Sequence, residues 1–159
     1  MERILEILEN DCNTSPAQIA LMLDMKEEDV VAAIEDFKKR GIILKNKSVI
    51  NWEKTDKPIV TALIELKVTP QRGLGFDKIA ERIYQYPEVK TVFLIAGAYD
   101  LTVIIEGKTM NEVARFVHSK LAPMECIVST ATHFVLKKYK VENIIFDDKI
   151  DDDRQVITL

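Results

Sequence analysis

The chain has 159 residues, of which 47 % are hydrophobic, and a formal net charge of −4 at pH 7. This length allows one average domain or two small ones, and the acidic balance gives no overall sign of nucleic-acid binding. No apolar run approaches the ~20 residues of a membrane span, and Cys12 and Cys126 lack metal or redox spacing, so we expect a soluble cytoplasmic protein with reduced cysteines.

Two helices are predicted before residue 25. Apolar residues at helical spacing predict the first, which ends near residue 10. The second begins with a capping box, in which Ser15 precedes Pro16 and Gln18. Its apolar stripe is predicted to consist of Ile19, Met22 and Leu23.

The third helix is predicted to run from about Lys26 to Arg40. Its first turn is acidic and its last turn is basic, which matches the helix dipole, and Gly41 is placed to end it. Beyond it, two short apolar segments, 42–44 and 49–50, flank a polar turn and predict a hairpin, or wing. We therefore predict a winged helix-turn-helix DNA-binding domain over residues 1–50.

Charge in this domain is divided between two stretches. Residues 37–50 contain five basic residues and no acid, which favours contact with phosphates. Residues 27–36, which include the positions that would enter the major groove, contain five acids and no base. The acids would repel the DNA backbone. An equally open interpretation is that these acids follow helix-capping preferences and lie on a solvated outer face.

Residues 51–58 are predicted to form a linker, with Trp52 packed between the domains. The second domain, 59–137, shows six elements in the order strand, helix, strand, strand, helix, strand. This order predicts an α+β chain whose second domain has the ferredoxin-like βαββαβ fold. Residues 138–159 are predicted to be a C-terminal extension with an acidic, solvated tail.

Helices on one face of a four-stranded sheet leave the other face bare. The second and third strands, near 89–96 and 101–105, are apolar throughout and are predicted to be buried. In the last strand, 126–136, Val128, Thr130, Thr132 and Phe134 are expected on one face. An uncovered apolar sheet needs a partner, and a second copy would serve, so we predict a homodimer.

The turn between the two central strands reads Gly97-Ala98-Tyr99-Asp100. Glycine adopts positive φ without steric cost and Asp hydrogen-bonds turn backbone, so both residues suit a tight reversal. A role in binding a ligand is an equally open interpretation.

The GxYD turn and its following strand, the segment 41–43 after the third helix, and the order of elements together resemble the Lrp/AsnC (feast/famine) family of transcriptional regulators, over about residues 2–137. The resemblance implies DNA binding by dimers or rings of dimers, commonly octamers of four dimers. It also implies a small-molecule effector, an amino acid or related metabolite, held between dimers. The implied ligand-binding residues are Gly97, Tyr99, Asp100, Thr130 and Thr132. Backbone N–H groups near Gly97 would meet a carboxylate and Asp100 an ammonium.

For double-stranded DNA, two groups of residues are candidates. Three lie near the groove, and five basic residues lie where the backbone would pass. They are Ser15, Gln18 and Lys26, and Lys38, Lys39, Arg40, Lys45 and Lys47. Family members usually carry Ser near the start of the third helix and basic residues along it, whereas this chain is acidic there.

Two functions follow. The first is a DNA-binding, metabolite-responsive regulator; the second is a metabolite-sensing oligomeric module with weak or lost sequence-specific DNA binding. An enzyme is disfavoured because His118 and His133 have no metal-ligand spacing and no nucleophile lies in an activated motif. We predict no catalytic residue, no metal site, no cofactor and no membrane contact.

Overall fold

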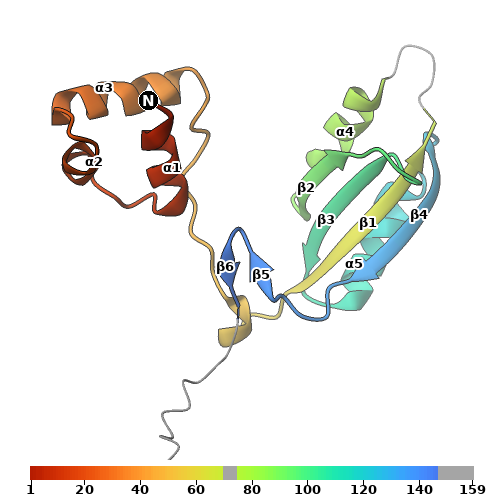
Figure 1. Cartoon of the computed structure of the whole chain (residues 1–159). Helices are drawn as coiled ribbons and strands as arrows, with labels where there is room; N and C mark the ends of the chain where they lie inside the picture. The colour runs from red at the N-terminus through yellow and green to blue at the C-terminus, as the bar shows by residue number, and fades with distance from the viewer. Residues whose placement is uncertain (70–74, 147–159) are drawn as a thin grey trace, which may run out of the picture. The chain divides into compact units, whose positions relative to one another are not determined.

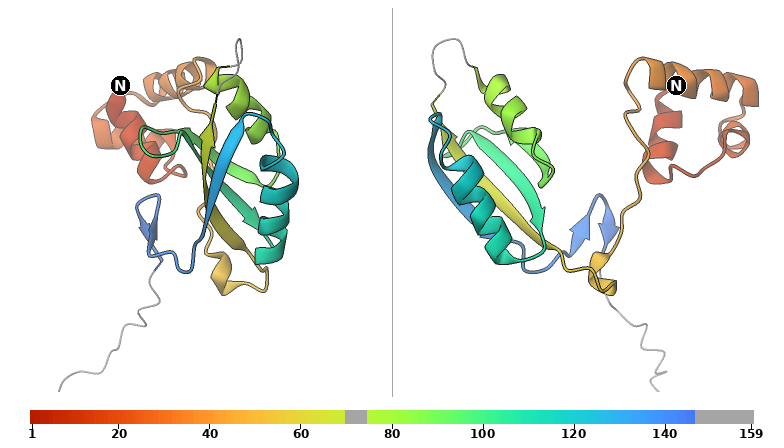
Figure 2. Two further views of the ribbon diagram at one scale, coloured as in Figure 1. Left: turned by 90° about the vertical axis from the view of Figure 1, so that its right-hand side faces the viewer. Right: turned by 180° about the vertical axis from the view of Figure 1, so that it is seen from behind.

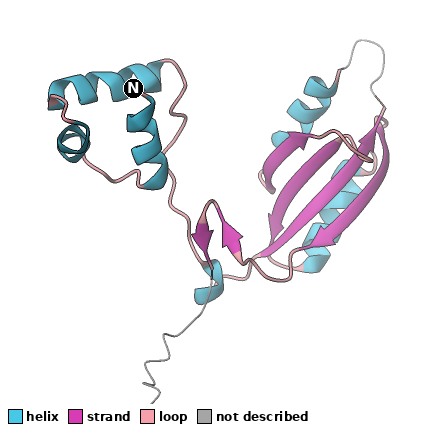
Figure 3. Cartoon of the chain, in the orientation of Figure 1, coloured by secondary structure: helices cyan, strands magenta, loops and turns pink. Residues whose placement is uncertain are grey.

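A computed structural model describes residues 1–69 and 75–146 (Figure 1). The chain divides into two compact units, the first comprising Met1–Ile50 and the second beginning at Asn51. The first is helical, and the second combines a sheet with helices (Figure 3). Residues 70–74 and the predicted acidic tail from residue 147 onward lie outside the described residues.

The first unit contains the three predicted helices: α1 (Glu2–Asn10), α2 (Pro16–Leu23) and α3 (Glu27–Lys39). Their core is a cluster of side chains that are almost wholly buried. It consists of Ile4, Ile19, Ala20, Val30, Ala33 and Phe37. Asp24 and Gly41 both have positive φ, of 53° and 69°, and end α2 and α3 respectively.

The predicted capping box at the start of α2 is confirmed. The Ser15 hydroxyl accepts from the Gln18 N–H at 3.3 Å, and the Ser15 N–H donates to Gln18 Oε1 at 2.9 Å. The predicted stripe of α2 is wrong at Met22, which is 67 % exposed. Each residue turns the helix by about 100°, so Ile19, Ala20 and Leu23 share one face and Met22 falls outside it.

The predicted hairpin over residues 42–50 is wrong, because this segment contains no strand. The N–H groups of Ile42 and Ile43 donate to the Phe37 carbonyl at 2.8 and 3.2 Å and close the end of α3. Beyond them, Leu44 is 88 % exposed, so apolar packing does not hold the segment in place. Two strands this short are marginal without a surface to pack on.

The second unit has the predicted ferredoxin-like order. Strands β1 (Val60–Val68), β2 (Val89–Leu94), β3 (Leu101–Gly107) and β4 (Ile127–Phe134) form an antiparallel sheet in the order β2-β3-β1-β4. Helices α4 (Phe76–Tyr84) and α5 (Met110–Phe116), the latter continued by a π-helical turn over Val117–Leu121, cover one face (Figures 1 and 2). A short 3₁₀ helix (Trp52–Lys54) precedes the sheet, and a small hairpin of β5 (Lys140–Val141) and β6 (Ile144–Ile145) follows it.

The helix-covered face of the sheet carries the core of the second unit. Alternate residues of β1 and β3 supply its centre, with Ile64 opposite Val103 and Leu66 opposite Leu101. All four side chains are essentially buried. Buried and half-buried residues alternate along β1 from Ala62 to Val68.

The other face carries a mixture of apolar and charged side chains. Its two central rows, read across the sheet, are Phe93, Thr102, Glu65 and Ala131, and Thr91, Ile104, Leu63 and His133. The face is therefore less apolar than the sequence indicated. The prediction that the second and third strands are both buried is wrong for β2. Phe93 on this face and Leu94 on the helix-covered face are 54 % and 61 % exposed, because β2 lies at the edge of the sheet.

A register shift changes the predicted faces of the last strand. Val68 pairs with Ile127 and Lys67 with Ser129, so Val128 is an extra residue in a bulge. Ile127 therefore shares the helix-covered face with Thr130, Thr132 and Phe134, and Val128 is 65 % exposed. The structure thus has Ile127 in the place on this face that was predicted for Val128.

Candidate effector site and nucleic-acid interface

Asp100 fastens the turn between β2 and β3 to the end of β1. Its N–H donates to the Leu66 carbonyl at 3.0 Å, and its carboxylate accepts from the Val68 N–H at 2.9 Å and from Lys67 Nζ at 3.2 Å. The motif had indicated bonds within the turn, so these partners were not expected. The Asp100 side chain is 21 % exposed. A carboxylate has about four acceptor positions, so Asp100 can accept a further hydrogen bond from a ligand.

These bonds hold the pKa of the Asp100 carboxyl below its ordinary value, chiefly through the Val68 N–H and then through Lys67, against an opposing effect of burial. A pKa lowered by folding stabilises the native state above the unfolded-state value of about 3.9, and this stabilisation is lost as the pH falls through the native pKa.

We therefore expect Asp100→Asn to lower the urea midpoint at pH 7 and to lose that deficit progressively below about pH 4. The matched control is Asp77→Asn, an exposed carboxylate on α4, which should change the midpoint little at either pH. A deficit that stayed constant from about pH 7 to pH 3 would show that the Asp100 charge does not stabilise the fold.

Gly97 does not have the positive φ predicted for it; among the described glycines, only Gly41 does. A Cβ built on Gly97 would meet nothing within 4 Å. Ala96, Gly97 and Ala98 are all exposed, whereas Tyr99 is half-buried. The fold of a single chain therefore does not require glycine at position 97, and the backbone there is open to a molecule from outside.

Thr130 and Thr132 lie on β4, opposite Leu66 and Ile64. The pairing places both threonines on the helix-covered face, whereas Asp100 bonds to Lys67, whose side chain is on the other face. Since Leu66 also pairs with Leu101, Thr130 lies two strands, or about 10 Å, from the hairpin. The structure brings the hairpin turn and Thr130 toward one end of the sheet, leaves Thr132 nearer the middle, and does not place them on one face.

The candidate DNA-contacting residues lie around α2, α3 and the following segment. Ser15 and Gln18 bond to each other in the capping box. Lys26 is the exposed N-cap of α3, and Arg40 pairs with Asp36 at 2.9 Å. The remaining candidates are exposed: Lys38, Lys39, Lys45 and Lys47.

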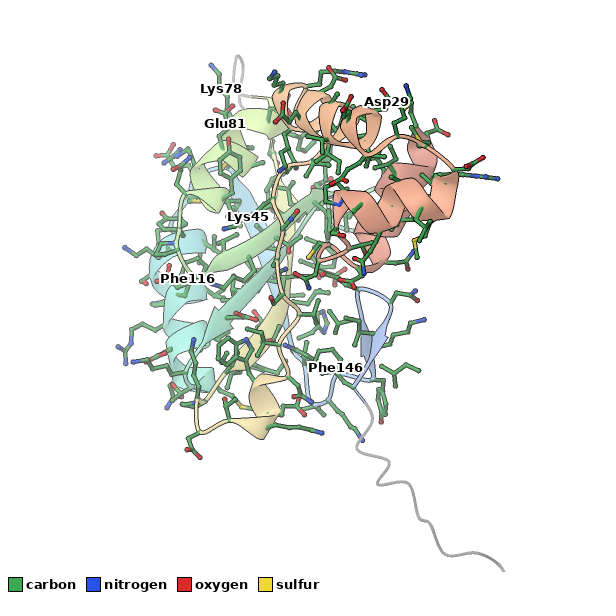
Figure 4. The ribbon with its side chains drawn as sticks, turned by 90° about the vertical axis from the view of Figure 1, so that its left-hand side faces the viewer. Asp29, Lys45, Lys78, Glu81, Phe116 and Phe146 are labelled. Atoms are coloured by element: carbon green, nitrogen blue, oxygen red, sulfur yellow. The ribbon has the colours of Figure 1, made fainter. Side chains whose placement is uncertain are left out.

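Acidic side chains nevertheless dominate the surface of α3. Glu27, Glu28, Asp29, Glu35 and Asp36 are exposed, and Figure 4 shows Asp29 on α3 and Lys45 on the extended segment. The first fifty residues contain ten acids and seven bases. Positive charge is thus concentrated at the end of α3 and beyond it.

Within the described ranges, no group of three or more His, Cys, Asp or Glu side chains is placed to hold a metal ion. His133 pairs with Glu65 at 3.1 Å on the uncovered sheet face, and His118 is exposed. In the same ranges, no helix has the length and hydropathy needed to cross a membrane.

Comparison with known proteins identifies the family. The model of the Lrp/AsnC ligand binding domain matches residues 61–145. The HTH-type transcriptional regulator YugG of Bacillus subtilis is 44 % identical over 156 residues, covering 98 % of this chain and 94 % of that protein. The chain belongs to the Lrp/AsnC family of transcriptional regulators.

Solved structures share the fold at lower identity. AsnC of E. coli matches with a TM-score of 0.69 at 18 % identity, covering 87 % of this chain and 91 % of that one. The transcriptional regulator NMB0573 of Neisseria meningitidis, in its complex with L-Met, matches with a TM-score of 0.71 at 18 % identity, covering 87 % and 88 %.

Proposed function

We propose that this protein is a cytoplasmic transcriptional regulator that binds double-stranded DNA through its first unit and responds to an amino acid or related metabolite through its second. The observation that carries the proposal is the family membership, which extends along the whole chain in the comparison with YugG. The protein acts by binding, not by catalysis. In this proposal residues 1–50 bind DNA, and residues 51–58 link the two domains. Residues 59–137 bind the effector and form the oligomer, and residues 138–159 form a C-terminal extension.

DNA recognition would use the helix that follows a tight turn. Residues 24–26 join α2 and α3, as in helix-turn-helix proteins whose second helix enters the major groove. Phosphates would be met by the five basic residues after position 37, where no acid interrupts them up to residue 50. The basic segment, rather than the acidic outer face of α3, would supply most of the affinity.

The effector would bind at the hairpin turn. The exposed backbone at 96–98 offers N–H donors to a carboxylate, and the absent side chain of Gly97 lets the ligand approach closely. The remaining acceptor positions of Asp100 suit an ammonium. Tyr99 completes the turn, and Thr130 and Thr132 would contribute from β4 on the helix-covered face. In the NMB0573 structure the bound metabolite is also an amino acid, L-Met.

Assembly would bring the uncovered sheet faces of two chains together, with four such dimers forming the octamer. That face presents Leu63, Phe93 and Ile104 beside the pairs Lys67–Asp100 and Glu65–His133. A two-fold interface lets each apolar residue meet its counterpart while the charged pairs lie at matching positions. A dimer also doubles the number of phosphate contacts on a symmetric DNA site.

Fluorescence anisotropy with a labelled duplex from the region upstream of the protein's own gene tests this proposal. We expect saturable binding that survives unrelated competitor DNA and that shifts when one of the free amino acids is added. Ligand-dependent assembly with no saturable DNA binding would instead establish the second candidate, a sensing module that no longer reads DNA, which the acidic surface of α3 favours. Saturable DNA binding whose affinity no free amino acid changes would contradict the proposed effector class.

A further inference from the structure

A cavity of about 470 Å³ lies in the second unit, away from the GxYD turn. It opens between the start of β2, the end of β3, α5 with its π-helical turn, and residues 57–59. We name it the β2–α5 cavity and define it by six lining residues: Glu88, Lys108, Glu112, Arg115, Phe116 and Lys120. Its volume is in the range of pockets that hold small metabolites.

One carboxylate oxygen in this cavity lacks a donor. Oε2 of Glu88 is shielded from solvent, and no hydrogen-bond partner reaches it from the described residues. The other two lining carboxylates are engaged: Glu106 pairs with Lys90 at 4.0 Å, and Glu112 accepts from the Lys108 N–H at 2.7 Å. A buried acceptor without a partner is unfavourable and rare in folded proteins, so a rotation of the Glu88 carboxylate toward a donor held in the cavity that Glu88 lines would remove this cost.

The cavity also has more positive than negative side chains. Five basic residues line it against three acids, and Arg115 makes no ion pair with any described residue. Lys57 and Lys120 lie over the aromatic rings of Trp52 and Tyr86, at 4.3 and 5.8 Å from the ring centres, not beside carboxylates. These cations are available to anionic groups of a ligand.

The cavity also has an apolar wall. Ile105, Val113 and Phe116 are buried and line the cavity, and Figure 4 labels Phe116 on α5. Glu112, Phe116 and Ser119 share one side of this helical segment by their spacing. The segment continues as a π-helical turn, a rare geometry that is frequent at functional sites.

From this arrangement we infer that the β2–α5 cavity is a second small-molecule site, separate from the hairpin turn, and that it binds an acidic amino acid. The ammonium group meets the Glu88 carboxylate, turned toward the cavity, the two carboxylates meet Arg115 and Lys120, and the intervening methylenes pack on Phe116. A ligand with one ammonium and two carboxylates carries one net negative charge, which complements the excess of basic residues.

Calorimetric titration of the full chain with L-glutamate, without DNA, tests the assignment. We expect saturable binding that weakens about tenfold or more in Glu88→Gln and in Arg115→Gln, because each loses a charge-assisted hydrogen bond. The matched controls, Glu81→Gln and Arg82→Gln on α4, are exposed outside the cavity and should keep the affinity. Arg115 is itself exposed, so the Arg115→Gln chain should fold. It therefore tests the site even where Glu88→Gln fails to fold.

Two analogues test the predicted contacts. Glutarate lacks the ammonium and L-glutamine lacks the second carboxylate, and each should bind about tenfold more weakly than L-glutamate. Emission of Trp52, the chain's single tryptophan, provides a second readout because Lys57 lies over its ring and lines the cavity. L-glutamate should change this emission in the native chain, and the midpoint of the change should move to about tenfold or higher ligand concentration in Arg115→Gln.

The inference is overturned by the absence of saturable L-glutamate binding, by equal affinity for glutarate, or by an unchanged affinity in Glu88→Gln. Binding abolished in Asp100→Asn and kept in Glu88→Gln would place the ligand at the hairpin turn and likewise overturn it. Because these titrations contain no DNA, failure of DNA binding would defeat the proposed function and leave this inference standing.

Discussion

A chain carrying Phe93→Asp should lose its ability to dimerise. Phe93 is 54 % exposed on the uncovered face of the sheet, in the row that contains Thr102 and Glu65. In the proposed dimer its ring is buried, and replacement by a carboxylate removes that burial and places a charge in the interface. Aromatic side chains that become buried contribute strongly to interface energetics, so we expect the dimer to weaken about 100-fold or more.

Sedimentation equilibrium over a concentration series measures this effect. Tyr84→Asp provides a closely matched control, because Tyr84 is an aromatic residue of nearly the same exposure, 53 %, on α4. Tyr84→Asp should assemble like the native chain. Equal weakening by both substitutions, or by neither, would show that the uncovered sheet face is not the dimer interface.

The second large effect is expected at the basic segment after α3. The triple variant Lys38→Ala/Arg40→Ala/Lys45→Ala should bind upstream DNA roughly 100-fold or more weakly at low salt, because both chains of a dimer then lack these three cations. Removal of Arg40 also leaves Asp36 unpaired near the DNA. The slope of log affinity against log salt should become shallower by about 0.9 for each phosphate that the variant no longer neutralises.

A control that removes the same charge from the second unit is Lys78→Ala/Arg82→Ala/Lys137→Ala, whose three side chains are exposed. It should retain the native salt slope. An equal loss of affinity in both triple variants would mean that net charge, rather than the basic segment, governs binding. An unchanged slope in the first variant would remove these residues from the interface.

Local signals in the sequence were sufficient for the helices. The capping box at Ser15 and the glycine at position 41 determine helix ends through bonds and dihedral angles within a few residues. The alternation in β1 likewise reports burial on one face. The order of these elements was enough to predict the βαββαβ arrangement and, through the GxYD turn, the family.

Features that depend on distant residues were not predicted. The hairpin expected at 42–50 requires a surface for Leu44, which the first unit does not provide. The bulge at Val128 arises from the register between β1 and β4, and no spacing within β4 indicates it. The partners of Asp100 depend on the register of strands more than thirty residues apart.

The candidate sites divide in the same way. Gly97 was identified by its motif, but its expected positive φ was wrong, because a turn of the length seen between β2 and β3 reverses the chain without it. The β2–α5 cavity was not predicted at all. Its lining comes from 57–59, 88–90 and 105–120, and no motif connects Glu88 with Arg115.

Nuclease protection over the region upstream of the gene would show most directly whether this chain reads DNA as a dimer despite its acidic third helix. We predict a protected segment with two symmetry-related half-sites about ten base pairs, or a multiple of ten, apart, which disappears in the Lys38/Arg40/Lys45 variant. Absence of protection at concentrations where the chain is fully dimeric would contradict DNA recognition and establish the sensing module in its place.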